Sequence, residues 1–174
     1  SIPISLNAGR LSEEQSSGFF SLSWRTLLLP SNRIGSTMHR LHVRNWITMD
    51  SLLQLLQSRF GFEDFRPSQR TVCETVTNGK DVLLVMPTGA GKSLCYQLPG
   101  LARAGTTVVI SPLLALIDDQ VSKLQSRGFR AHAIHSGIPR EQSREVCRDY
   151  LRGALDFLFI APERLAVPGF PELL

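Results

Sequence analysis

The chain has 174 residues, of which 43% are hydrophobic and 20% are charged, a composition typical of a globular protein with a buried core. Its net charge is +4, but residues 1–48 carry +3 of it, so the charge of the remaining chain does not indicate nucleic-acid binding. No apolar stretch approaches the roughly 18 residues that cross a bilayer, and we expect no membrane partner. The three cysteines have no paired or metal-type spacing, which favours buried thiols in a reducing compartment.

Residues 1–48 contain five arginines, two glutamates, no lysine and no sustained hydrophobic period. This composition would suit an organellar transit peptide. However, the chain does not begin with Met, and Met49 stands just before the first patterned helix. We therefore favour a leader or fusion remnant over 1–48 that has no fixed fold, and a folded domain over 49–174.

The folded part begins with two predicted helices. Asp50 can cap the first, which presents leucines on one face and ends before Gly61; the second runs from Ser68 to about Thr77. Apolar runs at 82–86, 106–110, 130–134 and 156–160 then alternate with helical patterns at 92–103, 113–127 and 140–152. This alternation predicts an α/β fold, with a parallel sheet and helices on both faces. Because the runs are almost continuously apolar, we expect strands buried on both sides.

Residues 86–93 read MPTGAGKS, between an apolar run and a helical pattern. This is the context of a phosphate-binding loop, although the strict pattern has Gly where this chain has Met86. Glycines at 89 and 91 allow positive φ, so that backbone N–H groups can close on phosphate oxygens. We predict Lys92 as the catalytic cation and Ser93 as a ligand of Mg²⁺. The residues predicted to hold the phosphates share this turn: Thr88, Gly89, Ala90, Gly91, Lys92 and Ser93.

Four segments, in this order and spacing, resemble motifs of RecQ-type ATP-dependent DNA helicases of superfamily 2. They are FGFEDFRPSQ over 60–69, MPTGAGKSLCYQLP over 86–99, SPLLALIDDQ over 111–120 and APERL over 161–165. The second segment includes the Met that departs from the general loop pattern. The resemblance covers about 50–174 and implies part of the first RecA-like motor lobe of a P-loop NTPase.

The resemblance assigns roles to residues outside the loop. It implies that Phe62 stacks on adenine and that Arg66 and Gln69 contact it, which suits an amide that offers both a donor and an acceptor. It also implies that Ser111 and Pro112 grip the backbone of single-stranded DNA, at a helix start where we expect N–H groups and the Ser111 hydroxyl to face outward. The implied cofactors are ATP and Mg²⁺, and the implied partners are single-stranded and duplex-junction DNA.

Other polar residues are predicted to have structural roles. Asp118, Asp119 and Gln120 are expected to make helix-end or inter-loop contacts, and the turn at 163–164 is not expected to supply a general base. His132 and His135 have no carboxylate or thiol cluster nearby in the sequence, which argues against a metal site.

Hydrolysis also requires acidic residues on a later strand, and the Asp-Glu-x-His motif of the family would follow after Leu174. We therefore expect this chain to form a lobe that is truncated before that strand. We also expect this chain alone to bind ATP weakly and not to hydrolyse it. Two alternatives stay open: a P-loop nucleotide-binding module that does not translocate, and an RNA helicase lobe. The implied location is the bacterial cytoplasm and nucleoid, or the nucleus of a eukaryote, and the oligomeric state is left open.

Overall fold

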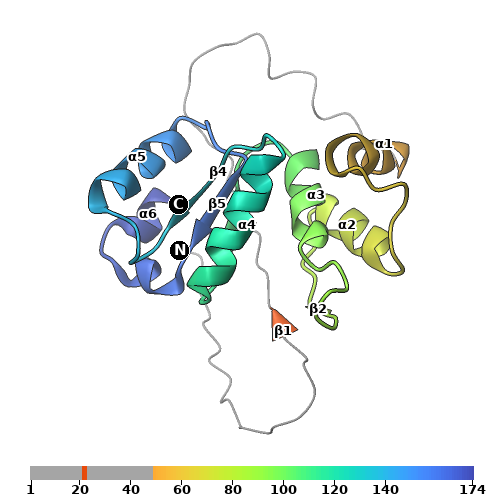
Figure 1. The fold of residues 1–174 in the computed structure, drawn as a ribbon, viewed down its shortest axis with the longest axis horizontal. Coiled ribbons are helices and arrows are strands. Elements are labelled where there is room, and N and C mark those ends of the chain that lie inside the picture. Colours follow the sequence, from red (N-terminus) through yellow and green to blue (C-terminus); the bar gives the residue numbers. More distant parts are fainter. Residues whose placement is uncertain (1–20, 23–48) are drawn as a thin grey trace, which may run out of the picture.

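The computed structural model describes residues 21–22 and 49–174 (Figure 1). The predicted leader over 1–48 therefore lies outside the described residues, apart from the two-residue strand β1 (Ser21–Leu22). In the part described, no helix is long and apolar enough to span a bilayer.

Three parallel strands form the main sheet. β5 (Phe157–Ile160) lies in the centre, between β3 (Thr107–Ile110) and β4 (Ala131–Ile134). The strands are in register, so that Val109 and Ala133 flank Phe159. Helices connect them, as predicted from the alternating pattern.

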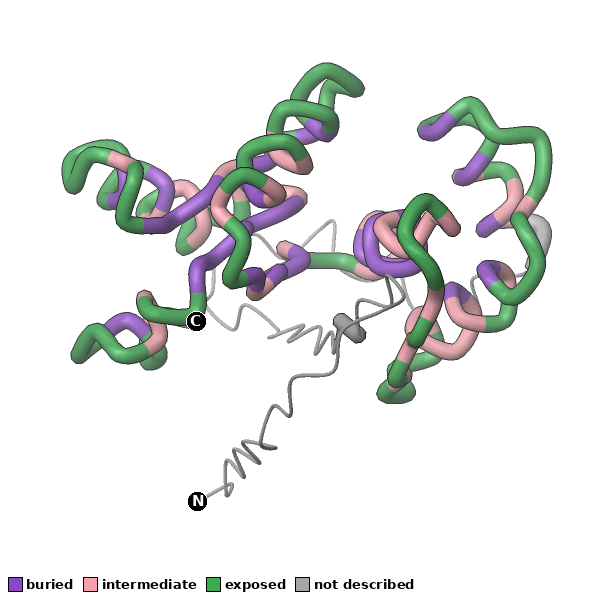
Figure 2. Tube along the Cα trace, turned by 60° about the horizontal axis from the view of Figure 1, so that its bottom comes forward, coloured by how far each residue is buried: buried purple, intermediate pink, exposed green. Residues whose placement is uncertain are grey.

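The three strands are mostly buried (Figure 2). Helices cover both faces of the sheet, and the side chains of β5 alternate between the two faces. Phe157 and Phe159 enter the larger core, on the side of α1 (Met49–Leu55), α3 (Leu94–Ala102) and α4 (Leu114–Ser126). Leu158 and Ile160 enter a second core, with α5 (Arg140–Leu151) and α6 (Phe170–Leu173). The predicted α/β architecture is confirmed.

The run at 82–86 does not join this sheet, so the prediction of four buried parallel strands is wrong for it. Only β2 (Leu84–Val85) is a strand, and it pairs antiparallel with β1. Leu83 and Val85 are 72% and 54% exposed. Among the described residues no strand of the main sheet lies beside β2, so its apolar side chains enter neither core.

The predicted helices are confirmed to within one or two residues. α1 begins at Met49 and continues as a π-helical turn, η1 (Leu56–Phe60), which ends at Gly61 with φ +73°. Asp50 therefore lies inside the helix rather than at its cap. α2 (Gln69–Thr77) follows, and the 3₁₀ turn η2 (Pro162–Ala166) comes after β5.

Ser68, which precedes α2, has φ +68° and is the one non-glycine residue with positive φ among those described. A side chain in this left-handed region costs about 1–2 kcal/mol. We expect Ser68→Gly to raise the free energy of unfolding by about 1 kcal/mol in urea titrations. Ser122→Gly, in the exposed interior of α4, is the control and should lower it by roughly 0.5 kcal/mol. Equal losses in both variants would contradict the prediction.

Candidate nucleotide-binding site

The loop over 86–93 connects β2 with α3 and has the backbone that the sequence predicts. Gly89 and Gly91 adopt φ +80° and +85°. The N–H of Ala90 donates to the carbonyl of Pro87 at 3.3 Å. In the described part of the chain, no atom accepts a hydrogen bond from the amides of Gly91, Lys92 and Ser93. These N–H groups at a helix start are therefore available to an anion.

Lys92 folds back over the start of the loop. Its Nζ donates to the carbonyl oxygens of Met86, at 2.7 Å, and Pro87, at 2.9 Å. An ammonium has three donors, so one remains beyond these two contacts. The positive charge thus lies beside the three available amides, as a phosphate-binding loop requires.

Arg66 and Gln69 reach across to the same loop. The Nη1 of Arg66 donates to the carbonyl of Gly89 at 2.9 Å, and the Nε2 of Gln69 donates to the carbonyl of Gly91 at 3.1 Å. The Oε1 of Gln69 accepts the backbone N–H of Arg66 at 2.8 Å. The Gln69 amide nitrogen has a second hydrogen to donate and its oxygen has a second lone pair, so contact with a base is still possible. The sequence did not predict that these side chains also support the loop.

Gly91 is required for a second reason besides its φ. A Cβ at this position would overlap Nε2 of Gln69. The buried Gln69 amide therefore lies directly against the loop backbone. The base-recognition segment and the phosphate loop form one unit, although 22 residues separate Gln69 from Gly91.

A cavity of about 220 Å³ lies between these two segments. Phe62, predicted to stack on adenine, lines this cavity and is 45% exposed. Of the predicted residues, Thr88, Ala90 and Lys92 do not line it. Arg127 was not predicted; it comes from the end of α4, and its guanidinium lies 5.6 Å from the centre of the Phe60 ring. The residues that line the cavity are Phe60, Phe62, Asp64, Arg66, Gln69, Gly89, Gly91, Ser93, Leu94, Gln97 and Arg127.

The predicted nucleic-acid contacts at the start of α4 need a correction. Ser111 is only 2% exposed, and its Oγ accepts the N–H of Leu113 at 3.4 Å. Its hydroxyl therefore does not face outward, because it satisfies the turn before α4. Pro112 is exposed, as predicted.

Helix-end or inter-loop contacts were predicted for three polar residues of α4; Asp118 and Gln120 contact other elements, whereas Asp119 bonds within its own helix. Asp118 pairs with Nε2 of His135, at the end of β4, at 3.1 Å. The Nδ1 of His135 accepts the N–H of Gly137, which assigns its proton to Nε2. Gln120 contacts α3, while Asp119 pairs with Lys123 one turn along the same helix at 2.7 Å. The described residues contain no cluster of metal-ligating side chains.

The fold and the loop together define a nucleotide-binding α/β domain. The family model described as DEAD/DEAH box helicase matches residues 66–168, and the chain belongs to this family. It is 41% identical over 128 residues to the ATP-dependent DNA helicase RecQ of Haemophilus influenzae. The aligned residues are 74% of this chain and 21% of that protein. It is 42% identical over 127 residues to the probable ATP-dependent DNA helicase RecS of Bacillus subtilis, with coverage of 72% and 25%.

These relatives confirm the resemblance to RecQ-type helicases. The chain spans about a fifth to a quarter of their length. A hypothetical ATP-dependent RNA helicase from Sulfolobus tokodaii has a similar structure, with a TM-score of 0.56 and 21% identity. The matched region is 72% of this chain and 37% of that chain. The similarity shows that the fold is that of a RecA-like helicase lobe.

Proposed function

We propose that the protein is a RecQ-type, ATP-dependent DNA helicase that moves 3′→5′ on single-stranded DNA in repair or recombination. This chain contributes the base-recognition segment and the phosphate loop of its first motor lobe. ATP is the nucleotide, and single-stranded DNA with duplex junctions is the partner. A DNA substrate and unpaired cysteines suit the bacterial cytoplasm or a eukaryotic nucleus.

One observation carries this proposal: Arg66 and Gln69 bond to the backbone of the phosphate loop and line one cavity with it. A nucleotide in this cavity would contact both segments at once. A P-loop module that only switches needs no second segment fixed to its loop. The bonds between these two segments therefore favour a motor in which base recognition and phosphate binding are linked.

Lys92 and Ser93 would bind the charged end of the nucleotide. Ser93 lies next to the available amides, and its hydroxyl oxygen is the kind of ligand that Mg²⁺ prefers, so Ser93 would hold the ion. When bound, Mg²⁺ neutralises charge that develops on the β- and γ-phosphates. Lys92 supplies a second positive charge from the protein, and the amides orient the phosphate oxygens.

DNA would contact the exposed Pro112 and the first N–H groups of α4, since Ser111 is buried and the N–H groups of Ser111 and Leu113 already bond within the protein. Contacts of this kind carry no sequence information, which suits a motor that works on any sequence. Both bacterial relatives are named as DNA helicases, which favours this substrate over RNA.

Strand separation by the purified full-length protein tests the proposal. We expect ATP and Mg²⁺ to support unwinding of a DNA duplex with a 3′ single-stranded tail. The same duplex with a 5′ tail, an all-RNA duplex, and reactions with a non-hydrolysable ATP analogue are the controls and should show none. Preference for the RNA duplex would favour the RNA helicase alternative, and ATP binding without any unwinding would favour the switch module.

A further inference from the structure

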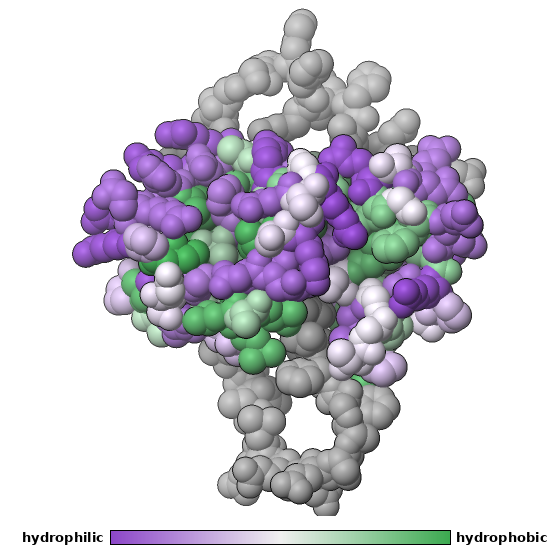
Figure 3. All heavy atoms as spheres, in the orientation of Figure 1, coloured by the Kyte–Doolittle hydropathy of each residue, from purple (hydrophilic) through white to green (hydrophobic). Residues whose placement is uncertain are grey.

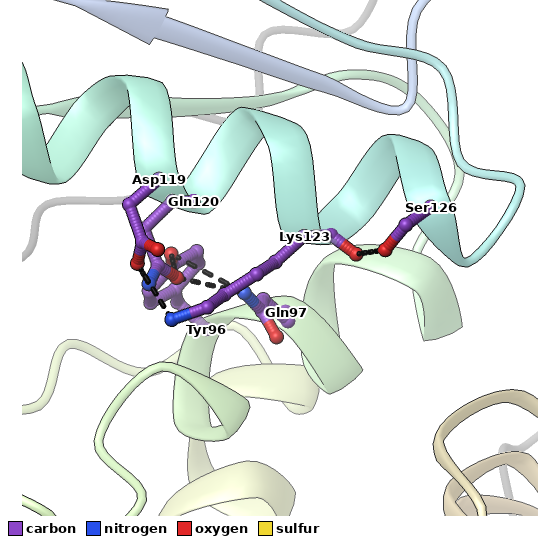
Figure 4. Close-up of polar contacts among 6 residues, drawn as sticks. All are labelled: Tyr96, Gln97, Asp119, Gln120, Lys123 and Ser126. Atoms are coloured by element: carbon purple, nitrogen blue, oxygen red, sulfur yellow. Dashed lines mark hydrogen bonds and ion pairs between the residues drawn. The ribbon is translucent and has the colours of Figure 1, made fainter.

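A partly buried polar network joins α3 to α4 (Figure 4). The hydroxyl of Tyr96 donates to Oε1 of Gln120 at 3.1 Å, and Nε2 of Gln97 donates to the same oxygen at 3.2 Å. Tyr96 and Gln97 are each only 5% exposed. The Nε2 of Gln120 donates to Asp119 at 3.4 Å, which fixes the orientation of the Gln120 amide. These bonds hold one side of α4 against α3.

The network also reaches the phosphate loop. Ser93, the residue just before α3, lines one small cavity together with Tyr96, and its hydroxyl acts to lower the pKa of Tyr96. Burial raises the pKa of Tyr96, against smaller opposing effects of the bonds with Gln97 and Ser93, so the hydroxyl stays protonated. Tyr96 has one proton and gives it to Gln120, so a Ser93 hydroxyl turned toward Tyr96 would donate to the phenol oxygen. The lone pairs of the Ser93 oxygen are then left for a metal ion.

The same residues lie close to the start of α4. Ser93, Tyr96, Ser111 and Gln120 line one cavity of about 20 Å³, enough for a single water molecule. Ser93 belongs to the phosphate loop, and Ser111 belongs to the turn that precedes α4. A shift of Ser93 on nucleotide binding would therefore displace Tyr96 and Gln120. Through them it would displace α4, whose start carries the proposed DNA contacts.

We propose that Tyr96 and Gln120 are positioning residues that couple nucleotide binding at Ser93 to DNA binding at the start of α4. The inference rests on the proposed function, and neither residue touches the reacting atoms. Tyr96 orients the Ser93 hydroxyl, and Gln120 transmits its position to α4. Coupling between two sites is reciprocal and is measured as the change in affinity for one ligand when the other is bound, commonly 5- to 150-fold, on the order of 1–3 kcal/mol.

Tyr96→Phe in the full-length protein tests this coupling, because it removes the hydroxyl and leaves the ring packed edge-on against Phe159. Fluorescence anisotropy gives the affinity for a labelled single-stranded oligonucleotide, with and without a non-hydrolysable ATP analogue and Mg²⁺. We expect the ratio of the two affinities to fall at least about fivefold toward one in Tyr96→Phe. A higher Mg²⁺ concentration should also be needed for half-maximal binding of the analogue.

Tyr150→Phe is the matched control, since it removes another tyrosine hydroxyl, which donates to the carbonyl of Leu174 at 3.1 Å. It should leave the ratio of affinities unchanged. A purely structural role of Tyr96 would lower the melting temperature without changing the ratio, and that outcome would overturn the inference. A wild-type ratio of one would overturn it as well. Loss of nucleotide or DNA binding by the wild-type protein would instead contradict the proposed function.

Discussion

Replacing Lys92 with Ala is expected to weaken ATP binding by about 30- to 150-fold, which corresponds to roughly 2–3 kcal/mol for a charged contact with phosphate. The reason is geometric, because the Lys92 ammonium lies beside the three amides of the loop that have no acceptor among the described residues. Titration of a fluorescent ATP analogue into the full-length variant measures the loss. ATP turnover stimulated by single-stranded DNA should fall by at least the same factor.

Lys80→Ala is the control for this measurement. Lys80 is an exposed lysine in the turn after α2, and the variant should bind the analogue like the wild-type protein. Because Lys92 also bonds to two loop carbonyls, circular dichroism should show that Lys92→Ala is still folded. Unchanged affinity and turnover in a folded Lys92→Ala variant would exclude the loop as the phosphate site.

The largest loss of stability from a small substitution is expected for Gly100→Ala in α3. A Cβ at Gly100 would overlap Oγ1 of Thr107 on β3 and would lie 3.1 Å from its Cβ. Overpacking of this kind costs roughly 1–3 kcal/mol, even though Ala is intrinsically favoured over Gly in helices by about 1 kcal/mol. Urea denaturation of the chain measures the change in the free energy of unfolding.

Thr107→Ala supplies the second arm of a double-mutant cycle. It removes Oγ1, which is buried and has no hydrogen-bond partner among the described residues, together with Cγ2. We expect Gly100→Ala to be markedly less destabilising in the Thr107→Ala background, because most of the overlapping atoms are gone. A Gly100→Ala variant more stable than the wild type would show that α3 can move away from β3.

Features that depend on local sequence were predictable. The positive φ of Gly89 and Gly91 follows from the loop pattern, and the ends of α2 and α5 follow from their capping and apolar patterns. The two-faced sheet follows from the alternation of strands and helices, since few other arrangements bury such strands.

Features that depend on which distant residues meet were not predictable. No local pattern shows that Gln69 supports the backbone of Gly91, or that Arg127 comes to the same cavity from the end of α4. The prediction that the Ser111 hydroxyl faces outward was wrong for the same reason. A serine at a helix start can face solvent or turn inward, and its surroundings in the fold decide between them.

The outer surface of α4 is largely hydrophilic in the view of Figure 3, whereas Leu83, just before β2, and Val85, in β2, are exposed. Among the described residues one edge of β2 has no partner strand, and an open edge beside exposed aliphatic side chains favours association between molecules. Preparations of this chain should therefore be kept at low concentration. Aggregation of folded molecules, rather than unfolding, should limit how much of the chain stays in solution.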